Sequence, residues 1–169
     1  NGSFTLDMII EIEPIGINEA NIIWEWHFWD HLIQDINPEY NNYGIISEHP
    51  ELLNINCNSS GGGGGSPGVG DWNHLNSIYY NEILNQIVIS SRHMNEFYVI
   101  DHSTNIDQAA SHIGGIYGKG GDFLYRWGNP ANYNRGDNSF QILNAQHAVN
   151  WIPNGYPGAG NFILFNNNH

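Results

Sequence analysis

The sequence predicts an all-β fold, built from four-stranded antiparallel units with short helical insertions. Short runs of β-branched and aromatic residues recur between tight-turn signals, which is typical of half-buried strands. The 169 residues include 26 Asn and 20 Gly, which favour turns and disfavour long helices. In one region three strands joined by short turns are followed, after a longer excursion, by a fourth, and this spacing matches one blade of a β-propeller. A β-sandwich gives similar strands and is the alternative.

Eight segments carry the strand pattern and are separated by clusters of Gly, Pro, Asn and Asp. They are Asp7–Glu13, Asn21–His27, Leu75–Asn81, Gln86–Ser91, Glu96–Asp101, Phe123–Trp127, Ala148–Ile152 and Asn161–Phe165. Helix is expected only over Trp29–Ile36 and over Asp107–His112, where Ser103 or Thr104 would cap the first turn.

These segments divide the chain into four parts. Residues 1–56 would form the end of one blade plus a helical insertion, residues 57–70 a glycine-rich loop, residues 71–130 one complete blade and residues 131–169 the start of the next. A closed propeller needs at least about four blades of four strands, whereas this chain supplies roughly two. We therefore expect a segment of a longer propeller, or completion by other copies in a homo-oligomer, because exposed strand edges invite pairing. The first residue, Asn1, agrees with a processed or partial polypeptide.

The charge balance excludes several classes of partner. Four Lys and Arg against 17 Asp and Glu give a net charge of −13, so the chain repels nucleic acids and anionic lipid surfaces. No apolar run reaches the roughly 18 residues of a membrane span. A single cysteine, Cys57, excludes an internal disulfide framework.

Three clusters of polar residues could bind an anion or carry out chemistry. His74 and Asn76 would share one face of a strand, because side chains alternate along it, and both can donate hydrogen bonds. A hydrogen-bonded histidine where a polar strand begins is the simpler interpretation. Arg92 follows an apolar strand, where it would form a surface ion pair or hold a sulfate or phosphate with its planar guanidinium. His147, at the start of another strand, is either structural or, as a neutral imidazole, a nucleophile.

His27 and His31 are a weaker candidate, for a metal site. On a helix they would lie four residues apart beside Asp30, a spacing that can hold a divalent ion. However, Phe28 stands where the HExxH motif has its glutamate, and the neighbouring tryptophans favour packing, so we expect no metal site. The Gly61–Gly65 run lacks the GK[ST] ending of a phosphate-binding loop, and we assign it no function.

Seven motifs occur in order along the chain outside the glycine-rich loop. They are Trp24-Glu25-Trp26-His27-Phe28-Trp29-Asp30-His31-Leu32, Asp71-Trp72-Asn73-His74-Leu75-Asn76-Ser77-Ile78, Ile89-Ser90-Ser91-Arg92-His93, Leu124-Tyr125-Arg126-Trp127-Gly128-Asn129-Pro130, Gln146-His147, Pro157-Gly158-Ala159-Gly160-Asn161 and Phe165-Asn166-Asn167. Together they resemble the bacterial arylsulfate sulfotransferases, the type that does not use 3′-phosphoadenosine phosphosulfate. The second and third motifs are the more specific ones.

This resemblance implies a six-bladed β-propeller that moves a sulfuryl group from an aryl sulfate ester to a phenolic acceptor through a sulfated histidine, without a cofactor. By resemblance His147 matches the nucleophile. His74, Asn76 and Arg92 match the residues that hold the sulfuryl oxygens, and His74 and Arg92 would also stabilise the transition state. The resemblance also implies a periplasmic or secreted location. The alternative function is a non-catalytic propeller that serves as a binding or self-assembly module.

Overall fold

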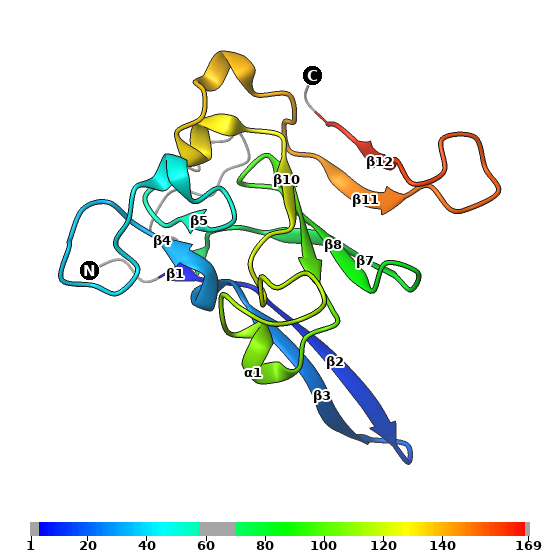
Figure 1. Ribbon diagram of the computed structural model, residues 1–169. Coiled ribbons are helices and arrows are strands. Elements are labelled where there is room, and N and C mark those ends of the chain that lie inside the picture. Colours follow the sequence, from blue (N-terminus) through cyan, green and yellow to red (C-terminus); the bar gives the residue numbers. More distant parts are fainter. Residues whose placement is uncertain (1–3, 58–69, 168–169) are drawn as a thin grey trace.

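The computed structural model describes residues 4–57 and 70–167, and these residues form an all-β fold, as predicted (Figure 1). The Gly61–Gly65 run lies outside the described residues. The strands are β1 (Phe4–Thr5), β2 (Met8–Ile15), β3 (Glu19–His27), β4 (Leu32–Ile33), β5 (Leu53–Asn54), β6 (Gly70–Asp71), β7 (Leu75–Asn81), β8 (Gln86–Ser91), β9 (Glu96–Asp101), β10 (Tyr125–Trp127), β11 (His147–Trp151) and β12 (Phe162–Phe165). The helical elements are α1 (Ile106–Ala109) and the 3₁₀ helices η1 (Phe28–His31), η2 (Ile46–Glu48), η3 (Pro130–Tyr133) and η4 (Asn138–Phe140).

The largest sheet contains four antiparallel strands in chain order, β7-β8-β9-β10. β7, β8 and β9 have the bounds that the sequence predicts, whereas β10 begins at Tyr125 rather than at Phe123. Phe123 instead buries its ring against Tyr98, with 4.2 Å between the stacked ring centroids. This strand order is the one expected of a propeller blade.

The central strand β8 is covered on both faces. Ile87 and Ile89 pack into one apolar cluster together with Trp26 and Phe28. Val88, which points to the opposite face because side chains alternate along a strand, packs into a second cluster that includes strand β11. Coverage on both faces explains why β8 and β9 are almost uniformly apolar or buried.

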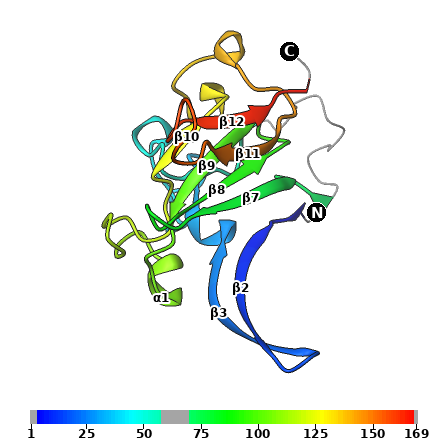
Figure 2. The same ribbon diagram turned by 90° about the vertical axis from the view of Figure 1, so that its right-hand side faces the viewer.

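The hairpin β2–β3 projects beyond the rest of the molecule (Figure 2). β2 continues through Pro14, which the sequence places in a turn, and the chain reverses after Gly16, whose φ of 61° is left-handed. An edge strand accommodates proline, because its missing N–H does not interrupt a ladder there. β11 and β12 form a second hairpin, shifted by one residue from the prediction at the start of each strand.

The two predicted helices are shorter than expected. In place of a helix over Trp29–Ile36, the single turn η1 is followed by β4, which pairs in parallel with β5. The distant partner strand overrides the local helical pattern, because it satisfies the backbone hydrogen bonds of β4. α1 is capped not by Ser103 or Thr104 but by Asn105, which forms a capping box with Gln108. Among the residues described, no helix is long and apolar enough to cross a membrane.

Candidate active site

The four predicted site residues lie at the ends of three strands. His74 directly precedes β7 and Asn76 is its second residue, Arg92 directly follows β8, and His147 is the first residue of β11. The backbone N–H of Arg92 donates to the carbonyl oxygen of His74 at 3.0 Å, so these two residues face each other across the strand pair β7–β8. The side-chain amide of Asn76 donates to the carbonyl oxygen of Gln146 at 2.6 Å. Since Gln146 directly precedes His147, the structure links the start of β11 to the start of β7.

His74 lies just outside its strand, in an unusual backbone conformation. Its φ is 49°, in the left-handed region, and a bulge separates Leu75 from Ser77 in the pairing with β8. Strict alternation therefore does not relate His74 to Asn76, contrary to the argument from the sequence. The half-exposed ring of His74 donates through Nδ1 to the carboxylate of Asp71, which fixes the orientation of the imidazole.

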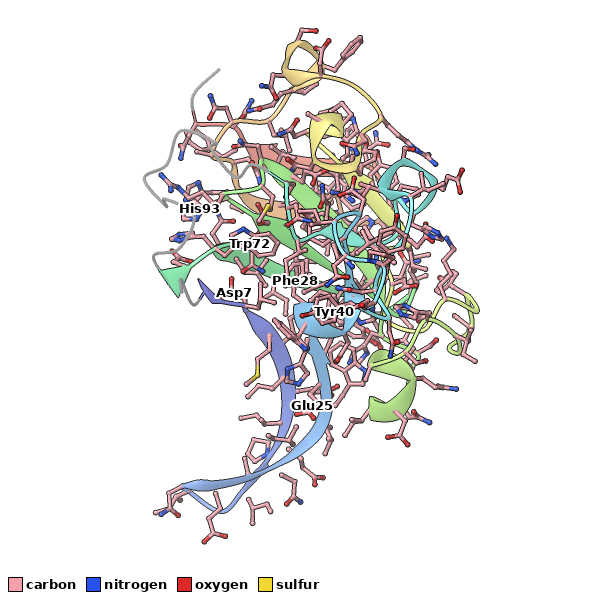
Figure 3. The ribbon with its side chains drawn as sticks, turned by 90° about the vertical axis from the view of Figure 1, so that its left-hand side faces the viewer. Asp7, Glu25, Phe28, Tyr40, Trp72 and His93 are labelled. Carbon is pink, nitrogen blue, oxygen red and sulfur yellow. The ribbon has the colours of Figure 1, made fainter. Side chains whose placement is uncertain are left out.

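Two neighbours that were not among the predicted site residues orient Arg92. His93 Nδ1 lies 3.0 Å from the carbonyl oxygen of Asp71, and a carbonyl only accepts, so Nδ1 carries the hydrogen. His93 Nε2 then accepts from Nη1 of Arg92 at 3.1 Å. The ring of His93 also lies 4.7 Å from that of His74, centroid to centroid. Figure 3 shows His93 at the same edge of the molecule as Trp72 and Asp7.

The sequence gives only weak evidence that His93 and Asp71 are positioning residues. His93 adjoins Arg92, and Asp71 stands three residues before His74, but neither spacing implies a contact. The arrangement depends on the chain 71–74 crossing the end of β8, which is a property of the fold. Asp7 fixes this crossing, because its carboxylate accepts from the backbone N–H of Leu75 at 2.7 Å.

His147 occupies an irregular start of β11. Ala145, two residues before it, and Ala148, directly after it, have φ values of 52° and 56°, and the pairing with β12 is shifted between His147 and Asn150. Such backbone strain is characteristic of functional sites, although it also occurs elsewhere. His147 Nδ1 lies 2.9 Å from the carbonyl oxygen of Ala145, so Nδ1 carries the hydrogen and Nε2 holds the lone pair. The amide nitrogen of Asn167 lies 3.0 Å from the same Nδ1, but because Nδ1 carries a hydrogen in this tautomer it does not accept from that nitrogen.

Gln146 anchors this irregular segment to the central sheet. Its side chain is fully buried and its amide nitrogen donates to Ser90 Oγ at 3.0 Å, to the carbonyl oxygen of Ser91 at 2.9 Å and to that of Glu96 at 2.8 Å. Ser77 adds a contact further along, since its hydroxyl accepts from the backbone N–H of Val149 at 3.1 Å. His147 is therefore held at the edge of the β7–β8 pair by the residues around it.

A second charged cluster lies inside the fold and is structural. Arg126 forms a bidentate ion pair with the fully buried Glu96, at 3.1 Å and 2.5 Å. Burial is the largest single influence on the pKa of Arg126 and lowers it, but Glu96 together with Tyr98 and Tyr133 outweighs burial, so the pKa of the guanidinium is raised. Burial, reinforced by Glu96, raises the pKa of Cys57 to about 12. The Cys57 thiol therefore stays protonated at neutral pH and is no nucleophile.

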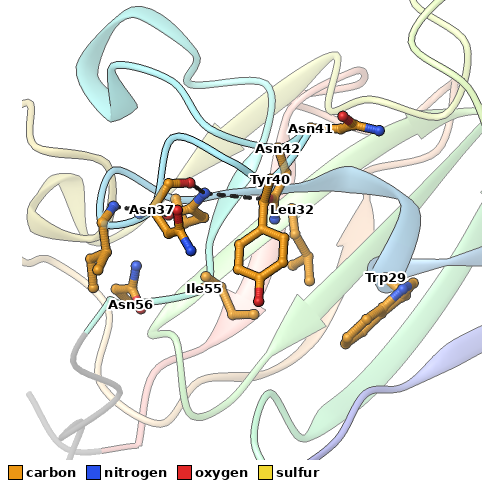
Figure 4. A pocket seen from close by; sticks show the side chains of 10 residues that line it. Trp29, Leu32, Asn37, Tyr40, Asn41, Asn42, Ile55 and Asn56 are labelled. Carbon is orange, nitrogen blue, oxygen red and sulfur yellow. Dashed lines mark hydrogen bonds between the residues drawn. The ribbon is translucent and has the colours of Figure 1, made fainter.

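A pocket of about 540 Å³ opens near η1, on a different part of the surface (Figure 4). Its walls include Trp29, Tyr40 and Ile55, and among the described residues that line it there is no Lys, Arg or His. The side-chain oxygen of Gln34 accepts from the backbone N–H groups of Ile36 and Asn37 in the adjacent loop. The described lining of this pocket therefore carries no positive side chain that would attract an anion.

The fold and the site define a β-sheet protein with a strained, histidine-rich edge that carries an arginine. A family model described as Arylsulfotransferase (ASST) matches residues 2–169, so the chain belongs to the arylsulfotransferase family. This confirms the resemblance seen in the sequence and supports a function of the arylsulfotransferase type. Comparison with curated proteins and with solved structures gave no match.

Proposed function

We propose that this chain carries the active site of an enzyme that moves a sulfuryl group from an aryl sulfate ester to a phenolic acceptor through a sulfated His147. The supporting observation is the 2.6 Å hydrogen bond from Asn76 to the carbonyl oxygen of Gln146, which joins segments 70 residues apart. His74 and Arg92 are paired at the same end of β7. The four residues that match the family's functional positions thus belong to one edge of the fold. The family resemblance supports a location in the periplasm or outside the cell, which cell fractionation tests.

In the first step the lone pair on Nε2 of His147 attacks sulfur and forms an N–S bond. The ester S–O bond breaks, and its electron pair leaves with the phenolate. Protonated His74 transfers a proton to that phenolate as a general acid. Arg92, which carries a permanent charge, and protonated His74 stabilise the negative charge that spreads over the sulfuryl oxygens.

In the second step the oxygen of the acceptor phenol attacks the same sulfur. The N–S bond breaks and returns its electron pair to Nε2 of His147, while the phenolic proton passes to His74, which is then ready for another cycle. Asp71 stabilises the cationic imidazole by accepting from its Nδ1–H. We assign the second N–H of the Asn76 amide to a sulfuryl oxygen, since the first is donated to Gln146.

The test is transfer from a chromogenic aryl sulfate to phenol, followed by release of the coloured phenol. We expect His147→Ala to abolish transfer, because the reaction has no other nucleophile. His49→Ala is the matched control, since His49 is half-exposed and its ring hydrogen-bonds to the nearby Glu51. A fully active His147→Ala protein would refute the assigned role.

One observation favours the alternative function, a self-assembly module without turnover. Met8, Ile10 and Ile12 lie on one face of β2 with exposures of 54%, 44% and 49%, and Ile22 of β3 stands opposite Ile12. An apolar strip of this kind on a projecting hairpin is typical of a surface that another chain covers.

Sedimentation velocity separates the two functions. If the hairpin mediates assembly, Ile12→Lys should convert oligomers to monomers. Ile83→Lys, in an exposed turn, is the matched control and should leave the oligomers intact. Ordered oligomers together with no detectable transfer would favour the assembly module over the enzyme.

A further inference from the structure

Three side chains of the kind that bind metals converge at a place that shares no residue with the candidate active site. They are His31 at the end of η1, His112 after α1 and Asp122 shortly before β10. One potential ligand atom from each lies within 4.8 Å of the other two. Oδ1 of Asp122 is 2.7 Å from Nδ1 of His31 and 2.8 Å from Nδ1 of His112. His112 and Asp122 are 10 residues apart, whereas His31 lies 91 residues before Asp122, so the fold brings His31 to the other two.

His31 has the surroundings of a metal ligand. Its ring is fully buried and is stacked on that of Trp26, with 5.3 Å between centroids and 6° between planes. Its Nε2 lies 2.8 Å from the carbonyl oxygen of Ala109, and therefore carries the hydrogen. Metal-binding histidines commonly donate their second N–H to a backbone carbonyl in this way, which fixes the ring and turns the other nitrogen toward the metal. The other nitrogen of His31 faces Asp122.

The backbone around Asp122 is held tightly against His31. Trp26 Nε1 donates to the carbonyl oxygen of Gly121 at 2.7 Å. A Cβ atom on Gly121 would lie 2.0 Å from the carbonyl oxygen of Ala109 and 2.6 Å from Nε2 of His31, so a glycine is required there. Two of the three ligands are thus preorganised by packing, which favours metal binding. The side chain of His112 is 59% exposed and leaves one side of the cluster open to solvent.

We propose that His31, His112 and Asp122 bind a divalent transition-metal ion, for which Zn²⁺ is the best match. Two imidazole nitrogens and one carboxylate oxygen form a known three-ligand set for Zn²⁺, with a fourth position left for water. The ion would tie η1 to the segment that follows α1 and so stabilise the long connection between β9 and β10. This departs from the sequence prediction of no metal. It also separates His31 from His27, whose ring nitrogen instead lies 3.7 Å from the carboxylate of Glu25.

The experiment titrates ZnCl₂ into the chelator-treated full chain, measured by isothermal titration calorimetry. We expect saturable binding that is weakened about tenfold or more by His112→Ala, and a rise in Tm with Zn²⁺ that the same variant loses. His112 is exposed, so this variant should fold, which circular dichroism verifies. His49→Ala, another half-exposed histidine beside a carboxylate, is the matched control and should bind as the unmodified chain does.

A second variant distinguishes the proposed site from the other group of potential ligands, Asp71, His74 and His93. Zn²⁺ binding that survives His74→Ala but is lost, or reduced by one ion, in His112→Ala supports the proposal. The proposal is overturned if the unmodified chain binds no Zn²⁺. It is equally overturned if His112→Ala binds Zn²⁺ with unchanged affinity and stoichiometry.

Discussion

Arg126, in β10, and Arg92, directly after β8, belong to the same four-stranded region but differ in what surrounds them. Arg126 is buried, and its donors go to Glu96 and to the carbonyl oxygens of Pro50 and Leu52. Its guanidinium also lies 4.1 Å from the ring centroid of Tyr133. Arg92 is half-buried at the end of β8, where it contacts the neutral imidazole of His93.

Because their surroundings differ, the two arginines have different roles. The positive charge of Arg126 compensates a buried carboxylate and its side chain is only 4% exposed, so Arg126 contributes to folding. Arg92 lies beside two histidines at an accessible edge, where a positive charge can act on a bound anion. In a chain with only four Lys and Arg residues, position rather than residue type separates the structural from the functional cation.

The largest expected effect is on stability, from Arg126→Met. This substitution leaves Glu96 buried without its partner, so we expect the free energy of unfolding to fall by about 3–5 kcal/mol in urea titrations. Arg135→Met is the matched control. Arg135 is exposed and donates to the carbonyl oxygen of Ser47 at 2.7 Å, and its loss should cost less than about 1 kcal/mol. Equal losses in both variants would contradict the structural role of Arg126.

The second effect is on transfer, from Arg92→Met. We expect aryl sulfate transfer to fall by about 10²–10³, because a donor to the transition-state charge is lost. The free energy of unfolding should change by less than about 1 kcal/mol, since the side chain is only half-buried. If Arg92→Met lowers the free energy of unfolding as much as Arg126→Met does, then Arg92 has a structural role too, and the distinction between the two arginines is wrong.

The third effect is a loss of stability at alkaline pH that arises in the interior cluster. The pKa of Cys57 rises from 9.0 to about 12 on folding, so the unfolded thiol ionises first as the pH rises. Its contribution to stability is complete below pH 9 and is lost between pH 9 and 12, by about 2 kcal/mol at about pH 10.5.

Urea titrations at several alkaline pH values test this dependence. Cys57→Ala should lose less stability than the unmodified chain over the same range. Burial also raises the pKa of Tyr98, and the loss of stability above pH 10 that this causes should persist in both proteins. Identical pH curves for the two proteins would show that the buried thiol is not the group responsible.

The smallest effect tests the positioning of Arg92 by His93. His93→Leu removes the acceptor for Nη1, and we expect kcat to fall by roughly tenfold with little change in KM, because the arginine loses its orientation rather than its charge. His93→Gln can both donate and accept, so it should restore part of the loss. A change in KM alone would point to weaker substrate binding rather than to positioning.

The sequence predicts the four-stranded sheet well because the signals for its strands are local. Alternation and turn residues define β7, β8 and β9 to the residue. The predicted helix over Trp29–Ile36 is wrong beyond its first turn, because β4 pairs with β5, about twenty positions further along the chain. No local pattern reports a partner at that separation.

The same limit, that local patterns do not reveal distant contacts, applies to the candidate active site. The motifs indicate which residues are candidates, but not that Asn76 holds the carbonyl of Gln146 or that His93 orients Arg92. The pairing of Glu96 with Arg126 is equally invisible, since 30 residues separate the two. Such contacts depend on how the strands pack, and that information enters only with the fold.

The most direct test of the proposed function is to look for sulfate on His147 itself. The full chain is incubated with an aryl sulfate without an acceptor, digested at neutral to mildly alkaline pH, and its peptides are analysed by mass spectrometry. Our account predicts that the peptide containing His147 gains the mass of one SO₃ group, and that adding phenol removes it. A modified peptide that does not contain His147, or transfer to phenol with no modified peptide at all, would contradict it.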